Sequence, residues 1–257
     1  NVISTCASMG ALRYGKYVHA QAIEEGLDWY EPISNSLLCM YARCGCVIDA
    51  NKFFKKISRP NVIAWTTMIY AYVQANLAQK ACSLFEQMIQ EGIKPDDVTY
   101  VSIIKACTSL SSLDFGLWIH EKIIRHGYEA NMFLGSALID MYSKCQNIDD
   151  ARAWFHVMPK QNVVSWTAVI GGYVQVGKGH EALDLFGKMQ QTNVKPNAFT
   201  FMTALNACAM IGAIEEGKQI HFYLVDIGLE LDAFVNSALI DMYSKSGSLV
   251  DARKFLE

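Results

Sequence analysis

Three histidines are the first residues whose spacing could do chemistry, because His19, His120 and His221 lie 101 residues apart. A recurring imidazole could act as a general base or a metal ligand. Each histidine, however, occupies an apolar position of a helical pattern that other parts of the sequence fill with phenylalanine. The strings that begin at His120 and His180 also lack the second histidine of a zinc-protease helix. We therefore interpret the three recurring histidines as structural.

Three of the cysteines are close enough in the sequence to be candidate metal ligands. Cys39, Cys44 and Cys46 lie close together, but no C-x-x-C pair accompanies them. Most of the eight cysteines fall within apolar helical patterns, which indicates reduced, buried thiols and a reducing compartment. A phosphate-binding glycine loop and the H-x-E with P-C-x-x-C signature of zinc deaminases are also missing. We predict no catalytic residue, no metal site and no cofactor in this chain.

Composition sets limits on the class of protein. The chain has 257 residues, of which 52% are hydrophobic, and only 5 prolines and 17 glycines, which argues against disorder. No run of about 18 uncharged apolar residues could span a membrane. The net charge is −3. Any nucleic-acid contact must therefore come from a local arrangement of Lys and Arg and not from an overall basic surface.

An internal repeat organises the whole sequence. The string SALIDMYSK occupies Ser136–Lys144 and again Ser237–Lys245, and Trp65 and Trp166 share the same offset of 101 residues. Within this period, apolar patterns restart near residues 31, 62, 97, 132, 163, 198 and 233. The spacings alternate between 31 and 35 residues, which is typical of a repeat protein.

Each 31- or 35-residue unit of the sequence is predicted to form two helices. The second helix carries apolar residues at i, i+3, i+4 and i+7, for example Ala81, Leu84, Phe85 and Met88. The same stripe returns as Ala50, Phe53, Phe54 and Ile57, as Ala151, Trp154, Phe155 and Met158, and as Ala182, Leu185, Phe186 and Met189. One hairpin cannot bury both of its faces, but stacked hairpins can. We predict an all-α solenoid of stacked helix-turn-helix repeats and expect the chain to be a fragment of a longer array.

The quoted repeats resemble those of a known family. The strings NVIAWTTMIYAYVQ and NVVSWTAVIGGYVQ, followed by GIKPD and NVKPN, are similar to pentatricopeptide repeats of the plant subclass that alternates P, L and S types. By this resemblance, residues 62–96 and 163–197 are P-type repeats, and residues 97–131 and 198–232 are L-type, with 1–30 a partial one. Residues 31–61 and 132–162 are S-type, with 233–257 a partial one.

The resemblance implies a right-handed superhelix that binds single-stranded RNA in plant mitochondria or chloroplasts. Members commonly act as specificity factors in organellar RNA processing, above all in C-to-U RNA editing. If this protein supports editing, a deaminase domain must lie elsewhere in the full-length protein or in a partner. Small editing-factor proteins that dock on L-type repeats are a further partner that the resemblance implies.

The family is known for reading one base per repeat with two or three side chains. By resemblance, these are the fifth and the last residue of each repeat. The predicted base-reading pairs are Asn35 with Asn61, Thr66 with Asp96, Val101 with Asn131, Ser136 with Asn162, Thr167 with Asn197, and Met202 with Asp232, followed by an unpaired Ser237.

Donor and acceptor chemistry gives these pairs a preference. An ionised aspartate only accepts hydrogen bonds and suits guanine or uracil, whereas asparagine can also donate and can serve adenine or cytosine. The step that separates purine from pyrimidine is taken from the family. The apolar Val101 and Met202 should discriminate poorly. With the family's polarity, the predicted RNA is pyrimidine-G-N-A-A-N, read from its 5′ end.

Two more sets of residues are predicted to contact RNA. The second residue of each repeat should stack on bases, a contact that tolerates any sequence. Lys and Arg at position 13 of the S-type repeats should contact phosphates. The stacking set is Ile63, Val98, Phe133, Val164, Phe199 and Phe234, with Pro32 departing from the pattern, and the phosphate set is Arg43, Lys144 and Lys245.

Alternatives remain for each set and for the whole. The inter-repeat Asn and Asp residues could simply cap the following helix. The apolar second residues could be ordinary core, and the position-13 cations could be solvated surface charge. A protein-binding scaffold of the tetratricopeptide kind is the second reading of the chain, although that class has a uniform 34-residue period.

Overall fold

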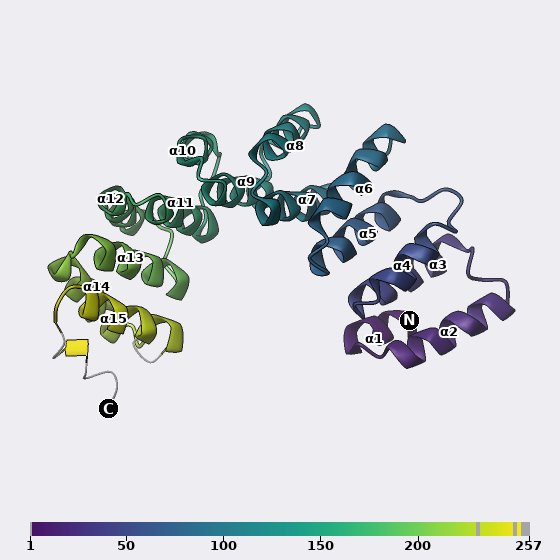
Figure 1. Cartoon of the computed structure of the whole chain (residues 1–257), viewed down its shortest axis with the longest axis horizontal. Coiled ribbons are helices and arrows are strands. Elements are labelled where there is room, and N and C mark those ends of the chain that lie inside the picture. Colours follow the sequence, from purple (N-terminus) through teal and green to yellow (C-terminus); the bar gives the residue numbers. More distant parts are fainter. Residues whose placement is uncertain (1, 230–231, 249–250, 253–257) are drawn as a thin grey trace. The chain divides into compact units, whose positions relative to one another are not determined.

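The computed structural model describes residues 2–229, 232–248 and 251–252, and within these ranges it contains helices and no β-strand (Figure 1). None of the described helices is long and apolar enough to cross a bilayer. In chain order they are α1 (Val2–Met9), α2 (Leu12–Glu24), α3 (Glu31–Arg43), α4 (Val47–Phe54), α5 (Val62–Gln74), α6 (Ala78–Gln90), α7 (Asp97–Leu110), α8 (Leu113–Arg125), α9 (Met132–Lys144), α10 (Ile148–Val157), α11 (Val163–Gln175), α12 (Gly179–Gln190), α13 (Ala198–Ile211), α14 (Ile214–Asp226) and α15 (Ala233–Lys245).

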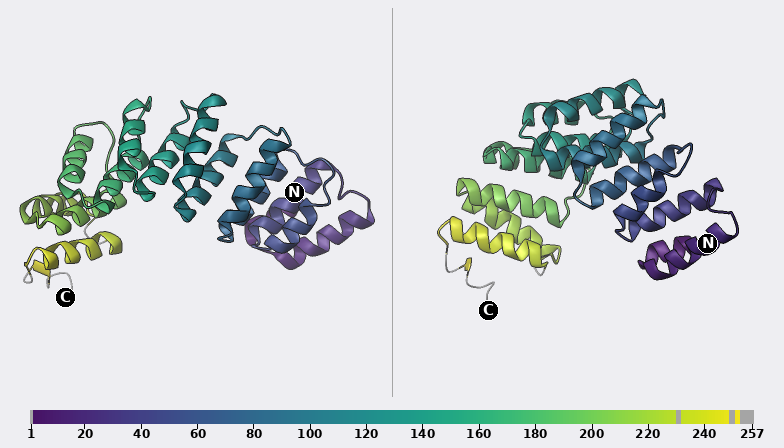
Figure 2. Two further views of the ribbon diagram at one scale, coloured as in Figure 1. Left: turned by 45° about the horizontal axis from the view of Figure 1, so that its top comes forward. Right: turned by 45° about the vertical axis from the view of Figure 1, so that its right-hand side comes forward.

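The helices form two units of stacked hairpins, residues 1–119 and 120–257, with α8 crossing the division. In the first unit, α1, α3, α5 and α7 pack in succession, and α2, α4 and α6 each contact the odd-numbered helices on either side. In the second unit, α9, α11, α13 and α15 pack in succession in the same way, and α10, α12 and α14 each contact the odd-numbered helices on either side (Figure 2). The predicted all-α solenoid of helical hairpins is confirmed within each unit.

The first helices begin where the sequence pattern restarts. α3, α5, α7, α9, α11, α13 and α15 start at residues 31, 62, 97, 132, 163, 198 and 233. The assignment of P, L and S types to these repeats stays a prediction. For the last partial repeat, residues 249–250 and 253–257 lie outside the described part of the chain.

The core lies between the two layers of helices in each hairpin stack. The alanines that open the second-helix stripe, Ala50, Ala81, Ala151 and Ala182, are fully buried. A small side chain at this point lets the second helix approach its neighbours closely. Phe54 then meets Trp65 edge-to-face at 5.0 Å, and Phe155 meets Trp166 at 4.7 Å. The predicted stripe is therefore the packing face of α4, α6, α10 and α12, although α4 ends at Phe54 and α10 at Val157, so that Ile57 and Met158 follow the helix ends.

The three recurring histidines join consecutive hairpins. Nδ1 of His19 lies 2.7 Å from the Tyr41 hydroxyl, and the corresponding distances are 2.7 Å for His120 to Tyr142 and 2.8 Å for His221 to Tyr243. Each histidine belongs to a second helix and each tyrosine to the following first helix. The three imidazoles hold three separate junctions, which agrees with a structural interpretation.

Two adjacent glycines of α11 differ in the space around them and provide a test of the packing. A Cβ on Gly172 would lie 2.5 Å from Oγ and 2.8 Å from Cβ of Ser143, whereas one on Gly171 would meet only Thr203 at 3.7 Å. Gly172→Ala should lower the thermal midpoint, because overpacking costs about 1–3 kcal/mol. Gly171→Ala should raise it, because alanine favours a helix by about 1 kcal/mol over glycine. Circular dichroism melts of both variants measure this, and equal shifts would contradict the described packing of α9 against α11.

The half-buried His120 predicts a pH dependence of stability. Burial lowers the pKa of His120 below its usual value, despite an opposing effect of Asp150. His120 is therefore protonated more easily in the unfolded chain than in the folded chain. Its contribution to the free energy of unfolding is complete above about pH 6.5 and is lost as the pH drops from there toward the lowered pKa. His120→Gln should reduce this loss between pH 7 and 5 in thermal melts.

The control for this experiment is His180→Gln, because His180 lies exposed on α12. The control should leave the loss of stability at low pH as it is in the parent chain. An equal effect of the two substitutions would contradict the prediction.

Candidate nucleic-acid interface

The six inter-repeat Asn and Asp residues all cap the helix that follows them. Oδ1 of Asn61, Asp96, Asn162 and Asn197 accepts a hydrogen bond from the backbone N–H three residues later, at 2.8–3.0 Å. Oδ1 of Asn131 and of Asp232 accepts from the second and third N–H at once. The capping interpretation is therefore correct for every one of them. It does not exclude a second role, because each side chain has another polar atom.

Capping leaves a different atom available on the two residue types. In Asp96 the cap uses Oδ1, so Oδ2 remains as an acceptor. In Asn197 the cap also uses Oδ1, so the remaining atom is Nδ2, which only donates. The helix start thus fixes the orientation of the side chain and the hydrogen-bonding character of its free end.

The structure brings three of the predicted pairs together. Oγ of Ser136 lies 3.3 Å from Oδ1 of Asn162. Thr66 is linked to Asp96 through the hydroxyl of Thr99, with distances of 2.5 Å and 2.6 Å. Thr167 is linked to Asn197 in the same way through Thr200, with distances of 2.8 Å and 2.9 Å. In these three repeats the fifth and the last residue therefore lie side by side at the start of neighbouring first helices.

The other predicted pairs are less well formed. Val101 and Met202 are half-buried and have no polar side-chain atom to place beside Asn131 or Asp232. Asn61 donates a short hydrogen bond from Nδ2 to the carboxylate of Glu31, the first residue of the same repeat. One of the two N–H groups of Nδ2 is therefore occupied, and one donor remains for a base. This contact and Pro32 both weaken the pair of Asn35 with Asn61.

The apolar second residues lie on the surface. The exposed fraction of the six side chains is between 54% and 73%. The interpretation of these residues as ordinary core is therefore wrong. Phe199 and Phe234 belong to neighbouring repeats, and their rings are stacked with centroids 6.5 Å apart. Exposed apolar side chains beside the paired polar groups form a surface on which flat, partly apolar groups such as bases can stack.

The predicted phosphate-binding cations are exposed, but two of them are paired. Nζ of Lys144 lies 2.8 Å from Asp140, one turn earlier on α9, and Nζ of Lys245 lies 2.8 Å from Asp241 on α15. No carboxylate is paired with Arg43 in the described part of the chain. Exposed pairs of this kind contribute little energy, so both lysines can exchange their aspartate for another anion.

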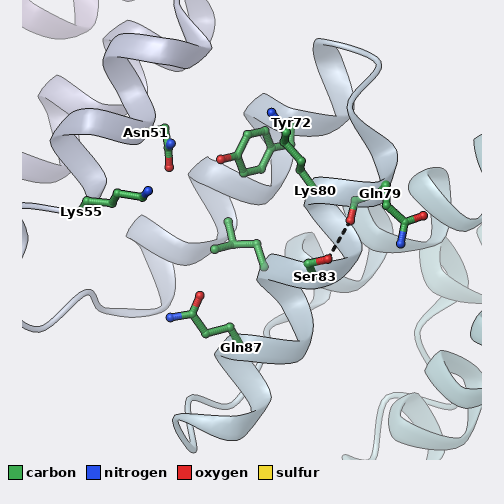
Figure 3. Close-up of a pocket in the computed structure, with 8 residues that line it drawn as sticks. Asn51, Lys55, Tyr72, Gln79, Lys80, Ser83 and Gln87 are labelled. Atoms are coloured by element: carbon green, nitrogen blue, oxygen red, sulfur yellow. Dashed lines mark hydrogen bonds between the residues drawn. The ribbon is translucent and has the colours of Figure 1, made fainter.

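Two pockets in the described part of the chain lie away from the predicted RNA-contact residues. A pocket of 280 Å³ between α4 and α6 is lined by Asn51, Lys55, Tyr72 and Ser83 among others, and none of its residues belongs to the predicted RNA-contact sets (Figure 3). The equivalent pocket between α10 and α12 carries Glu181 and Asp184 in place of Lys80 and Ser83. Among the described residues, no group of three or more His, Cys, Asp or Glu side chains could hold a metal ion.

Sequence reasoning missed one group of residues at this interface. Thr99, Ser165 and Thr200 form capping boxes with the preceding Asp or Asn, and all three are fully buried. The signal was present, because a Ser or Thr three residues after an Asn or Asp is the pattern of a reciprocal cap.

The repeats of the chain match models of a known family. A model of the PPR repeat family matches residues 60–109 and 161–210, and a second PPR repeat model matches residues 33–62, 98–128 and 136–163. A chloroplastic pentatricopeptide repeat-containing protein of Arabidopsis thaliana is 38% identical over 97% of this chain and 29% of its own length. A putative mitochondrial one is 34% identical over 100% of this chain and 41% of its own length. The chain thus spans less than half of these relatives.

Solved structures show the same fold. PPR10 from maize superposes with a TM-score of 0.79 at 21% identity, over 99% of this chain and 37% of PPR10. PPR10 in complex with an 18-nucleotide psaJ RNA element gives a TM-score of 0.69 at 20% identity, over 100% of this chain and 37% of PPR10. At these identities the likeness establishes the helical-repeat fold.

Proposed function

The chain belongs to the pentatricopeptide repeat family, and from this premise we propose that it reads the sequence of single-stranded RNA within an organellar RNA-processing factor. The observation that carries the proposal is the row of paired polar groups at the starts of the first helices, each flanked by an exposed apolar side chain. Relatives named chloroplastic and mitochondrial support an organellar location, and the PPR10 complex supports RNA as the ligand class.

Helix capping supplies a physical reason for base choice. Oδ2 of Asp96 is an acceptor and suits a Watson–Crick edge with a ring N–H, as in guanine or uracil. Nδ2 of Asn162 and of Asn197 is a donor and suits the ring nitrogen acceptor of adenine or cytosine. A free amide could rotate to present either atom, whereas a capping amide has its oxygen held by the backbone. Each good contact adds about 1–3 kcal/mol of discrimination, by analogy with DNA.

The proposed ligand is the string pyrimidine-G-N-A-A-N, with its 5′ end at the repeat of residues 31–61. The base at the first position should be read more weakly, because Glu31 accepts from one of the two N–H groups of Asn61 Nδ2 and so competes with a base. Affinity comes from stacking on the exposed second residues and from phosphate contacts near Arg43, Lys144 and Lys245. Six repeats give a short footprint, so the full-length protein would set the specificity for one transcript.

The finer role that we propose is that of a specificity factor in C-to-U RNA editing. Its support is the alternation of 31- and 35-residue repeats, which resembles the family subclass that serves editing. The repeats of Val101 and Met202 have no polar fifth residue and suit contact with small editing-factor proteins better than contact with a base.

The first test changes one base preference. Thr66→Asn places a donor and an acceptor beside Asp96, so the preference should shift from G toward U at the second position of the string. Fluorescence anisotropy with RNAs that differ only at this base measures the shift. Thr66→Ser is the matched control, because it retains the hydroxyl and should retain the preference for G. An unchanged preference in Thr66→Asn would contradict the placement of the base-reading pair.

The second test concerns phosphate contacts. Lys144→Ala should reduce the slope of log K against log salt by about 0.7, the value expected for one phosphate contact to a single strand. Asp140→Asn should strengthen binding at low salt, because it removes the anion that competes with phosphate for Lys144. Lys188→Ala is the control, because Lys188 forms the same kind of pair with Asp184 on the second helix α12. Equal slopes for Lys144→Ala and the parent chain would mean that Lys144 is a solvated surface charge and does not contact a phosphate.

A further inference from the structure

Three repeats carry a buried hydroxyl at their third residue that no contact with RNA requires. These residues are Thr99, Ser165 and Thr200, and their relative exposure is 0%. Each forms a capping box with the last residue of the preceding repeat. Because the last residue is a proposed base reader, the hydroxyl holds a side chain that must face a base.

The hydrogen bonds of Thr99 have a defined direction. Its Oγ1 donates to Oδ1 of Asp96 at 2.6 Å, and it accepts from the backbone N–H of Asp96 at 3.3 Å. The single hydroxyl proton of Thr99 is thus held by a carboxylate, which is a stronger acceptor than a neutral hydroxyl. Thr66 lies 2.5 Å away and must therefore donate its own proton to Thr99. The hydroxyl of Thr66 then has only lone pairs left to offer a ligand.

The same arrangement recurs 101 residues later. Oγ1 of Thr200 donates to Oδ1 of Asn197 at 2.9 Å. Thr167 has two acceptors for its proton, the carbonyl of Val163 at 2.7 Å and Oγ1 of Thr200 at 2.8 Å. Either choice turns the proton of Thr167 inward. The free end of this pair consequently presents an acceptor on Thr167 and a donor on Asn197.

The third hydroxyl, that of Ser165, forms its hydrogen bonds with the backbone of Asn162. Oγ of Ser165 donates to the carbonyl of Asn162 and accepts from its N–H, both at 2.9 Å, while Ser136 donates to the carbonyl of Met132 at 2.8 Å. Ser165 therefore stabilises the start of α11 and leaves Oδ1 of Asn162 within reach of Ser136.

Hydroxyls at the two positions occur together. Where the fifth residue of a repeat is Thr66, Ser136 or Thr167, the third residue of the next repeat is Thr99, Ser165 or Thr200. Where the fifth residue is Asn35, Val101 or Met202, the third residue of the next repeat is Ala64, Leu134 or Val235. All six boundaries follow this rule, so the presence of the buried hydroxyl tracks the presence of a hydroxyl at the base-reading position.

We propose that Thr99, the third residue of the repeat that follows Thr66, is an additional specificity-determining position, which acts by setting the direction of the proton on Thr66. Thr99 is a positioning residue in this scheme, because it acts through Thr66 and need not touch RNA. The proposal rests on the base-reading role proposed above and deepens it.

The arrangement separates guanine from uracil at the pair of Thr66 with Asp96. With the proton of Thr66 turned inward, both residues present acceptors. The Watson–Crick edge of guanine offers two adjacent donors, N1–H and the N2 amino group, and matches both acceptors. Uracil offers N3–H alone between two carbonyl acceptors, so one of its carbonyls would oppose the lone pairs of Thr66.

The experiment removes the buried hydroxyl and leaves the shape. Thr99→Val frees the proton of Thr66, which can then donate to a uracil carbonyl. Binding should be measured by anisotropy for the string with G, U or A at the second position. The G-over-U preference should fall about threefold to tenfold, which is the size of one hydrogen bond. The G-over-A preference should persist, because Asp96 still presents an acceptor.

Two controls keep the result interpretable. Thr99→Ser retains the hydroxyl and should restore the G-over-U preference. Thr108→Val removes a hydroxyl from the same helix, one that bonds only to the carbonyl of Ile104, and should leave all preferences unchanged. A melt of each variant shows whether it is folded, and the comparison of preferences is made on folded variants at equal temperature.

The outcomes separate the two proposals. If the parent chain has no base preference at this position, the base-reading function itself fails. If the parent chain prefers G and Thr99→Val retains the same G-over-U ratio, the base-reading function stands and the role of Thr99 is overturned. If Thr99→Val lowers affinity for all three bases equally, Thr99 serves only to stabilise the helix start, and the proposal is again overturned.

Discussion

The side-chain N-cap at the six repeat boundaries from Asn61 to Asp232 is the interaction on which the rest of this structure depends. A helix start leaves backbone N–H groups without partners, and an Asn or Asp side chain satisfies one or two of them. In this chain the capping residue is also the last residue of the preceding repeat. The cap therefore fixes where one hairpin ends and the next first helix begins, and it holds one polar atom of each side chain in a constant place. Within each of the two units, oriented polar groups at successive helix starts follow from this local requirement.

Capping and base recognition are compatible because they use different atoms. Asn61, Asp96, Asn162 and Asn197 all give Oδ1 to the backbone, and this leaves Oδ2 of Asp or Nδ2 of Asn for another partner. The substitution of Asp for Asn would thus preserve the helix start while it reverses the character of the free atom. A repeat protein can change its ligand in this way without a change in its fold. Asn61 illustrates the limit, because one of its two Nδ2 N–H groups is already bound to Glu31.

The repeats differ in what they can offer a ligand even though their backbones are alike. Thr66, Ser136 and Thr167 lie beside their polar partners, whereas Val101 and Met202 interrupt the row with apolar side chains. Ion pairs with Asp140 and Asp241 reduce the net charge near Lys144 and Lys245, which is consistent with a chain of net charge −3. Recognition by such a surface must come from placement of single groups more than from overall attraction.

The sequence alone determined the helical repeats and their starting residues, because the apolar period and the 101-residue offset are local patterns that recur. It also placed Ala81 and Phe85 in the core and the three histidines at structural positions. It could not decide whether Ile63 or Phe234 was buried, because an apolar residue beside a helix start fits either a core or a surface. Nor could it show that the hydroxyl of Thr99 lies between Thr66 and Asp96. These facts depend on which side chains from different repeats come within hydrogen-bonding distance, and only the packing of one hairpin on the next decides that.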